Sequence, residues 1–312
     1  MRKVIGIGET VLDIIFKDNK PVTAVPGGST FNAIVSLSRA GVPTCFLSEA
    51  GDDRIGDVVF SFLKDNGVQA DYMLRTPESK SPVSLAFLDA DNHADYIFYR
   101  DPSHATPEFN YPEVNADDIV IFGSFYAVNP AIRHQVSAFL EYAKKQGAIL
   151  YYDVNFRPSH RNDLLKATPN LIENLEMASI VRGSNEDFGV IYKQQDPDKA
   201  YKAEVSFYCK NFICTQGAKP VIVHSANNFR KEYAVQPMET VSTIGAGDNF
   251  NAGFIYGMIK YGVTLDQLQN AAEGALTETT WDKLVDCGLQ FSADCCKDIY
   301  NYISKEFGEK FK

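Results

Sequence analysis

Short apolar segments alternate with helical patterns along most of this chain, and the alternation limits the folds that it can adopt. Continuous apolar segments at 4–8, 44–50, 119–122 and 149–152 predict buried strands. A strand that is apolar on both faces must be covered on both faces, so we expect an α/β fold with helices flanking a mostly parallel sheet. The 312 residues would suit one large domain or two smaller ones. No internal repeat or long flexible linker divides them, and we expect a single domain over residues 1–312.

The remaining elements follow from periodicity, caps and turn residues. A helix is expected to open at Gly27-Gly28-Ser29-Thr30 and to end near Gly41. The other helices are predicted at 55–66, 131–146, 200–209, 246–261, 265–276 and 293–303, and further short strands at 179–181, 212–214 and 221–223.

Two segments break the alternation and predict a small β lid. Residues 83–88 and 96–99 flank the turn-like sequence 89–92 and indicate a hairpin, and residues 11–16 form a strand interrupted by Asp13. The lid is therefore expected to comprise about residues 10–26 and 82–104, placed over one edge of the sheet.

Charge and composition exclude several classes of partner. The net charge of −10 argues against a nucleic-acid partner, because binding a phosphate backbone needs a basic surface. No stretch of 18 apolar residues exists, so we expect no membrane association and a cytoplasmic location. The six cysteines form no CxxC pair, which suggests reduced thiols, with a structural zinc site as the weaker alternative.

The segment 242–253 carries the strongest chemical signal. Gly245, Ala246 and Gly247 lead into a helical pattern, and the first amides of a helix form an anion site. Asp248 stands where the anion would dock, although like charges repel. A carboxylate suits this position if it takes a proton from a hydroxyl that attacks a phosphoryl group.

Several polar residues follow predicted strands and are expected to converge at one edge of the sheet, where ligands bind in open parallel sheets. These residues are Glu9, Asp13, Asp153, Asn155, Arg157 and Ser184. Structural explanations remain open for some of them. Asp13 could be a solvated lid residue, and Arg157 could pair with a surface carboxylate. No Ser-His-Asp order is evident among the histidines, and they are assigned no catalysis.

The glycine segment around Gly27, Gly28 and Asn32, together with 242–253, resembles the ribokinase-like (PfkB-type) carbohydrate kinases. The resemblance covers nearly the whole chain and implies a three-layer α/β/α sandwich with a β lid. The stretch 153–159 and the sequence Phe98-Tyr99-Arg100 look like those of fructokinases and ketodeoxygluconate kinases. Thr30 and Ile34 depart from the family pattern, which could reshape the sugar pocket.

The resemblance implies a role for each matching residue. Asp248 would be the catalytic base, with Gly245, Ala246 and Gly247 as the anion hole. Sugar contacts would come from Asp13, Gly27, Gly28, Asn32, Tyr99, Arg100, Asn155 and Arg157. Nucleotide contacts would come from Ser184, Thr215, Gly217, Gly245 and Gly247, and Mg²⁺ contacts from Glu186 and Asp187. Glu186 and Asp187 could instead only favour a helix N-terminus.

The implied activity is ATP-dependent phosphorylation of a sugar hydroxyl, with ATP and Mg²⁺ as cofactors and a monovalent cation such as K⁺ left open. Fructose is the first choice of sugar, followed by 2-keto-3-deoxygluconate and then by ribose and nucleosides. A catalytically silent sugar- or nucleotide-binding protein is the rival from a different class. A nicotinamide dehydrogenase is a weaker rival, because Gly6-Ile7-Gly8 lacks the third glycine of a dinucleotide fingerprint. A homodimer through the lid is also expected from similar kinases.

Overall fold

The computed structural model describes residues 2–89, 94–101, 109–226, 228–270 and 274–312. Its main sheet has the strand order β13-β12-β11-β10-β9-β8-β1-β4-β5. These strands are β1 (Val4–Ile7), β4 (Thr44–Gly51), β5 (Met73–Thr76), β8 (Ile119–Gly123), β9 (Ile149–Asp153), β10 (Ile180–Ser184), β11 (Phe212–Gln216), β12 (Lys219–His224) and β13 (Arg230–Tyr233). All pairs from β11 to β5 are parallel, and the β11–β12 and β12–β13 pairs are antiparallel.

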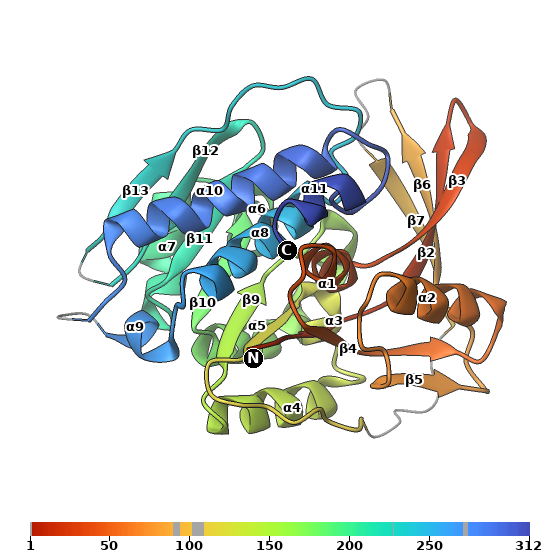
Figure 1. Ribbon diagram of the computed structural model, residues 1–312, viewed down its shortest axis with the longest axis horizontal. Coiled ribbons are helices and arrows are strands. Elements are labelled where there is room, and N and C mark those ends of the chain that lie inside the picture. The colour runs from red at the N-terminus through yellow and green to blue at the C-terminus, as the bar shows by residue number, and fades with distance from the viewer. Residues whose placement is uncertain (1, 90–93, 102–108, 227, 271–273) are drawn as a thin grey trace.

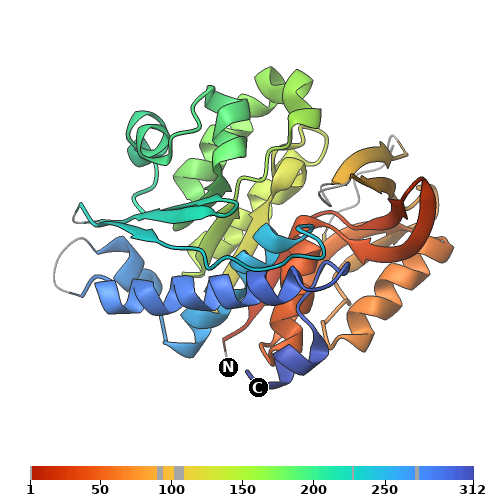
Figure 2. The same ribbon diagram turned by 90° about the horizontal axis from the view of Figure 1, so that it is seen from above.

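Helices cover both faces of this sheet and give three layers (Figures 1 and 2). One face packs against α1 (Ser29–Arg39), α2 (Arg54–Asp65), α8 (Ala246–Lys260), α9 (Leu265–Gln269), α10 (Glu278–Cys295) and α11 (Lys305–Glu309). The other packs against α3 (Ser124–Val128), α4 (Arg133–Lys145), α5 (Leu164–Met177), α6 (Asn185–Tyr192) and α7 (Pro197–Ala203). The strands are buried on both faces because alternate side chains of each strand enter the two separate cores, as their unbroken apolar runs predict.

A second, four-stranded sheet forms the lid beside the main sheet (Figure 1). Its order is β3 (Lys20–Gly27), β2 (Val11–Lys17), β6 (Val83–Leu88) and β7 (Ala94–Tyr99). The β2 strand and the β6–β7 hairpin were predicted, whereas β3 was missed because its exposed first half shows no apolar pattern. The turn predicted at 90–92 and the lid residues predicted at 102–104 lie outside the described residues.

Two of the helices predicted near the C-terminus are wrong. The helix predicted at 265–276 ends at Gln269. The helix predicted at 293–303 is replaced by α10, which begins after Thr277, whose side chain accepts a hydrogen bond from the Thr280 amide. The chain leaves α10 at Cys295, and residues 299–303 return toward the lid, where the Tyr302 hydroxyl donates to the Pro26 carbonyl. The long helices α5 and α10 were also not predicted.

The strand order places a crevice at one point of the main sheet. From β1 the chain first adds β4 on one side and later adds β8 and β9 on the other. Ligands bind beyond the carboxyl ends of parallel strands at such a switch point. The residues that follow β1, β8 and β9 there include Glu9, Ser124 and Asn155, and all three line one pocket.

Candidate active site

A glycine turn opens helix α8 at the centre of this pocket. Gly245 has φ 76°, in the left-handed region that favours glycine, and a Cβ there would lie 2.8 Å from the carbonyl oxygen of Asn301. The Ala246 amide donates to the Thr243 carbonyl at 3.2 Å. Ala246 is therefore already used by the turn. Of the three predicted anion-hole residues, Gly245 and Gly247 therefore remain the candidates for binding an anion through their amides.

Asp248 lies in the first turn of α8 and is held by two residues of α1. The Ser29 hydroxyl donates to its Oδ1 at 2.8 Å, and the Asn32 amide donates to its Oδ2 at 2.8 Å. Only 7% of Asp248 is exposed. Burial, assisted by the nearby charge of Asp153, raises the pKa of Asp248 to about 6 against the lowering effect of these two hydrogen bonds. The helix N-terminus favours the ionised form.

If Asp248 is the base that the sequence predicts, its pKa sets the direction of a pH profile. Asp248 can accept a proton only when it is ionised, so turnover should be full above the pKa and fall as the pH drops below about 6. The measurement is kcat against pH from 4.5 to 9, with enzyme returned to pH 7.5 to check that acid has not inactivated it. A rate that stays constant down to pH 4.5 would contradict this assignment.

Asp13 of β2 also lines the pocket. Its carboxylate accepts hydrogen bonds from the Ser84 hydroxyl and from the Asn301 amide, the latter at 3.2 Å. Burial raises the pKa of Asp13 to about 6. Gly27 packs against this carboxylate, since a Cβ there would lie 2.6 Å from Oδ2 of Asp13. Asp13 is thus a fixed, buried acceptor and not a solvated lid residue.

Strand β7 contributes the lid side of the pocket, and it corrects one predicted contact. Tyr96, Phe98 and Arg100 line the pocket, whereas Tyr99 does not and is 59% exposed. Successive side chains of a strand point to opposite faces, so Tyr99 lies on the outer surface of the lid. Arg100 pairs with Glu9 at 2.7 Å and thereby links the lid to the main sheet.

Arg157 reaches the pocket from the loop after β9. Its guanidinium lies over the Tyr96 ring, 4.9 Å from the centroid. Asn155, two residues earlier, has φ 35°, and its amide donates to the Ser124 hydroxyl at 3.4 Å. Ser124 has φ 59°, so two non-glycine residues in the left-handed region face the same pocket. Such backbone strain concentrates at functional sites.

The other predicted nucleotide and metal residues lie apart from Gly245, at the ends of β10 and β11 and in the turns after them, and are not among those that line this pocket. Ser184 and Asp187 form a reciprocal capping box at the start of α6, in which the Asp187 carboxylate accepts from the Ser184 amide at 2.7 Å. Glu186 is exposed in the same turn. Gly217 has φ 61° with open space at its Cβ position, so the turn and not packing requires glycine. Within the described ranges, no three His, Cys, Asp or Glu side chains are grouped to hold a metal ion.

The structure adds functional candidates that sequence reasoning missed: Ser29, Ser124, Arg182 and Asn301. Arg182 is the clearest case, because its side chain is buried in the middle of β10 and pairs with Asp153 at 2.9 Å. It also donates to the Thr215 hydroxyl at 2.7 Å. A charged residue inside the apolar sequence 180–183 was the available signal, since buried charges need partners.

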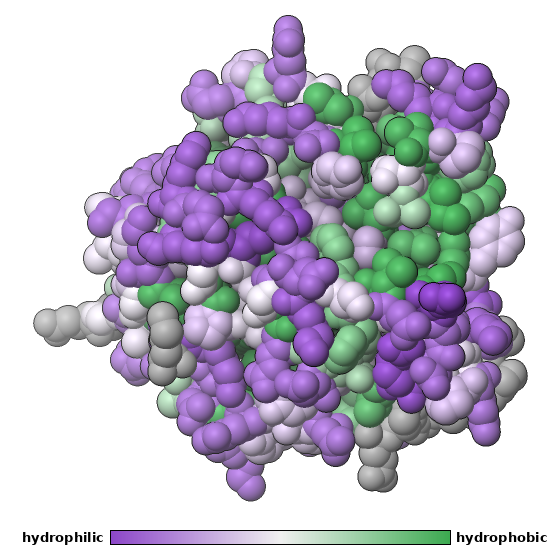
Figure 3. All heavy atoms as spheres, turned by 45° about the vertical axis from the view of Figure 1, so that its right-hand side comes forward, coloured by the Kyte–Doolittle hydropathy of each residue, from purple (hydrophilic) through white to green (hydrophobic). Residues whose placement is uncertain are grey.

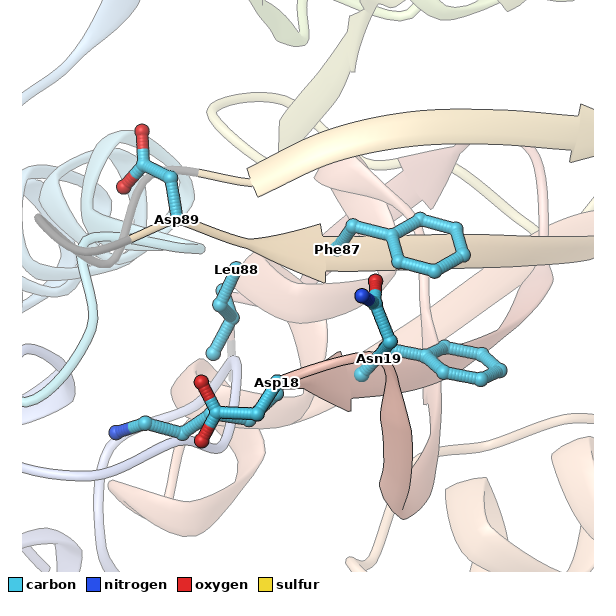
Figure 4. A pocket seen from close by; sticks show the side chains of 7 residues that line it. Asp18, Asn19, Phe87, Leu88 and Asp89 are labelled. Carbon is cyan, nitrogen blue, oxygen red and sulfur yellow. The ribbon is translucent and has the colours of Figure 1, made fainter.

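A second hollow lies at the far end of the lid (Figure 4). It is lined by residues 16–19 and 87–89, including the stacked rings of Phe16 and Phe87, whose centroids are 4.7 Å apart. It contains none of the residues described above, and we assign it no part in the chemistry.

Two further features expected from the sequence concern the cysteines and membrane-spanning helices. All six cysteines are buried free thiols, as expected. None of the helices in the described part of the chain is both long and apolar enough to cross a bilayer.

A buried carboxylate beside a glycine turn, at the switch point of a lidded parallel sheet, is the arrangement expected of a phosphotransferase that acts on an alcohol group, and the family match shows that class. Residues 1–275 match the model described as pfkB family carbohydrate kinase, so the chain belongs to this family. The fold class predicted from sequence, a ribokinase-like α/β/α sandwich with a β lid, is confirmed.

The individual relatives share at most 28% sequence identity with this chain among those described here. A 5-dehydro-2-deoxygluconokinase of Geobacillus thermodenitrificans is 28% identical over 251 residues, which cover 76% of this chain and 73% of that protein. Probable fructokinase-6 of Arabidopsis thaliana is 25% identical, covering 81% of this chain and 69% of the relative. The fructokinase of Vibrio cholerae, solved with fructose, ADP and calcium ion, superposes with a TM-score of 0.84 at 20% identity, covering 100% of this chain and 99% of that one.

Proposed function

We propose that the protein is an ATP-dependent kinase of a neutral sugar, with D-fructose as the first candidate and fructose 6-phosphate as its product. The observation that carries this proposal is the position of Asp248, a buried carboxylate fixed at the start of α8 and facing a pocket lined with polar groups. A carboxylate at an anion-binding helix terminus is explained by proton abstraction during phosphoryl transfer.

In the proposed reaction, Asp248 takes the proton of the sugar hydroxyl as its oxygen attacks the γ-phosphorus of ATP. The bond between that phosphorus and the ADP oxygen breaks. The Gly245 and Gly247 amides hold the charge that develops on the transferred group. Asp13 and Asn32 hold the sugar, and Arg157 lines the same pocket. Closure of the lid excludes water, which limits hydrolysis of ATP.

Thr215, Gly217 and the capped turn at Ser184 would line the nucleotide side. Asp187 is committed to its capping box, so Glu186 is the carboxylate with freedom to face Mg²⁺, directly or through water. One carboxylate is enough, because Mg²⁺ at kinase sites keeps waters and phosphate oxygens as its other ligands. Bound there, Mg²⁺ would offset the charge of the phosphates. Whether K⁺ activates the enzyme is left open, and the assay described below includes it.

The charges of the pocket favour a neutral sugar. Three carboxylates and two arginines line it, and Arg100 is already paired with Glu9. An additional substrate carboxylate would have to displace Glu9 from Arg100 or compete with Asp13 and Asp248 for Arg157. The second candidate is a keto-deoxy sugar acid, which the two arginines could bind and which the name of the Geobacillus relative suggests.

The experiment is ADP release with Mg·ATP across D-fructose, 2-keto-3-deoxygluconate, 5-dehydro-2-deoxygluconate, ribose and adenosine, each with and without K⁺. Fructose should give the highest kcat/KM. Preference for either sugar acid would overturn the neutral-sugar proposal and leave the kinase proposal standing. If none of these acceptors supports ADP release, a silent binding protein on a kinase fold becomes the better description.

Replacing Asp13 should separate sugar binding from nucleotide binding. Asp13→Ala removes two accepted hydrogen bonds and a fixed acceptor for sugar hydroxyls. A lost hydrogen bond to a charged group costs about 1.5–3 kcal/mol, so the sugar KM should rise about 10- to 100-fold. The KM for ATP should change less than threefold. Steady-state kinetics with each substrate varied in turn provides the measurement, and an unchanged sugar KM would remove Asp13 from the sugar site.

For the assembly, we propose a homodimer through the lid. The outer surface of the lid carries the exposed apolar side chains Val22 of β3 and Ile97 and Tyr99 of β7. Figure 3 shows apolar residues gathered on the side of the molecule where the lid lies. Edge strands with exposed apolar residues readily pair with a copy of themselves. Light scattering coupled to size exclusion tests this, with Val22→Asp and Ile97→Asp expected to give the monomer mass.

A further inference from the structure

A continuous series of polar contacts runs from Asp248 away from the sugar pocket and into the protein interior. The Ser29 hydroxyl lies 2.8 Å from Oδ1 of Asp248 and 3.3 Å from Oδ2 of Asp153. Asp153 pairs with Arg182, and Arg182 reaches Thr215 beneath the nucleotide side. Because a hydroxyl has one hydrogen, Ser29 can donate to only one of the two carboxylates at a time.

Asp153 is held in place by an ion pair and by a second hydrogen bond. It is 2% exposed, its Oδ1 accepts from Arg182 at 2.9 Å, and its Oδ2 accepts from the Asn251 amide at 2.9 Å. Burial lowers the pKa of Arg182, but the Asp153 charge outweighs this and raises it, so the guanidinium stays charged. This ion pair packs against the turn at residues 245–248, here called the anion turn, since a Cβ on Gly247 would come within 2.9 Å of Nη2 of Arg182.

We propose that Ser29 is a positioning residue that switches its hydrogen bond between Asp248 and Asp153 during proton transfer. This inference rests on the proposed role of Asp248 as the base. While Asp248 is ionised, Ser29 donates to it. When Asp248 has taken the proton of the sugar hydroxyl, it donates to the Ser29 oxygen, and Ser29 donates to Oδ2 of Asp153. The new O–P bond forms and the bond to ADP breaks in the same reaction, and the proton on Asp248 later leaves to solvent.

The switch of the Ser29 hydrogen bond favours proton transfer to Asp248, because Asp248 keeps a complete set of hydrogen bonds in each of its protonation states. Without Ser29, Asp248 and Asp153 would face each other as two buried carboxylates with no donor between them. The other titratable groups near Asp248 are Arg157, Tyr96 and Cys295. Burial raises the pKa of Tyr96 to about 12 and also raises that of Cys295, so both are neutral over the tested range. Arg157 stays charged throughout that range, because its pKa is raised by Tyr96 and Asp248 despite burial.

The test compares pH profiles of kcat for the wild type, Ser29→Ala and Ser29→Thr. Ser29→Ala removes a donor to ionised Asp248, so the acid limb should move upward by about 0.5–1 pH unit and kcat on the plateau should fall about 5- to 50-fold. Ser29→Thr keeps a hydroxyl, so the position of its acid limb and its kcat on the plateau should both stay close to those of the wild type. Ser36→Ala is the matched control. It removes another α1 hydroxyl, which donates to the Asn249 side chain at 2.6 Å, and it should leave the acid limb in place.

Coupling to Asp153 needs a double-mutant cycle. Asp153→Asn removes the neighbouring negative charge and should move the acid limb downward, opposite to Ser29→Ala. If Ser29 links the two carboxylates, the combined shift should differ from the sum of the single shifts by at least about 0.3 pH unit. Circular dichroism and ADP binding check that each variant is folded.

The outcomes separate the two proposals. If the wild type phosphorylates no sugar, the proposed function fails before Ser29 is tested. If it does turn over, an unmoved acid limb in Ser29→Ala overturns the role of Ser29. Additive shifts in the cycle overturn the switch to Asp153.

Discussion

Asp248→Asn is expected to reduce kcat by about 10²–10⁴, the range that general-base catalysis supplies. The substitution keeps the size of the side chain, and its carbonyl oxygen can still accept from the Asn32 amide while its NH2 group faces the Ser29 oxygen. An amide, however, cannot accept the proton of the sugar hydroxyl. The Gly245 and Gly247 amides are unchanged, so the affinity for ADP should stay within about threefold. Single-turnover assays and ADP titration by calorimetry measure the two quantities separately.

The control for this prediction removes an equal charge elsewhere. Asp65→Asn, at the exposed end of α2, changes the net charge by the same amount far from the anion turn and should leave kcat within twofold. Near-normal turnover in Asp248→Asn would mean that another group takes the proton. An equal loss of turnover and ADP binding would instead indicate a damaged fold.

Arg182→Met should lower the free energy of unfolding by about 3–5 kcal/mol, the cost of leaving a buried charge without its partner. Arg182 is 5% exposed and Asp153 is 2% exposed, so water cannot replace the lost ion pair. Urea unfolding followed by tryptophan fluorescence reports the loss through Trp281, which is buried in the core beside α8. Adding Asp153→Asn to Arg182→Met should recover part of the lost stability, because it removes the unpaired charge.

A surface arginine gives the matched comparison. Arg230 pairs with Asp198 and Glu232 but is 39% exposed on β13. Arg230→Met should therefore cost about 0–1 kcal/mol, as exposed ion pairs do. If Arg182→Met proved no more costly than Arg230→Met, water would have to reach Asp153, and the buried series from Asp248 to Arg182 would lose its basis.

The parts of the fold that follow local rules could be predicted from sequence. The apolar runs of β1, β8 and β9 specify strands buried on both faces, and Gly245 to Asp248 specify an anion turn before a helix. Prediction failed where tertiary context decides. Strand β3 is recognisable only through its pairing with β2, and the predicted contact at Tyr99 lay one residue from the inward-facing Phe98. A shift of one residue along a strand reverses the face to which a side chain points.

The sequence by itself therefore determined the α/β class, the lid, the anion turn with its carboxylate, and the resemblance to carbohydrate kinases. These depend on spacing within short segments, and local backbone geometry follows from spacing. Only the tertiary structure decided that Ser29, Asp153 and Arg182, from three distant segments, meet behind Asp248. Their contacts depend on strand order and helix packing, and no single stretch of sequence contains that information.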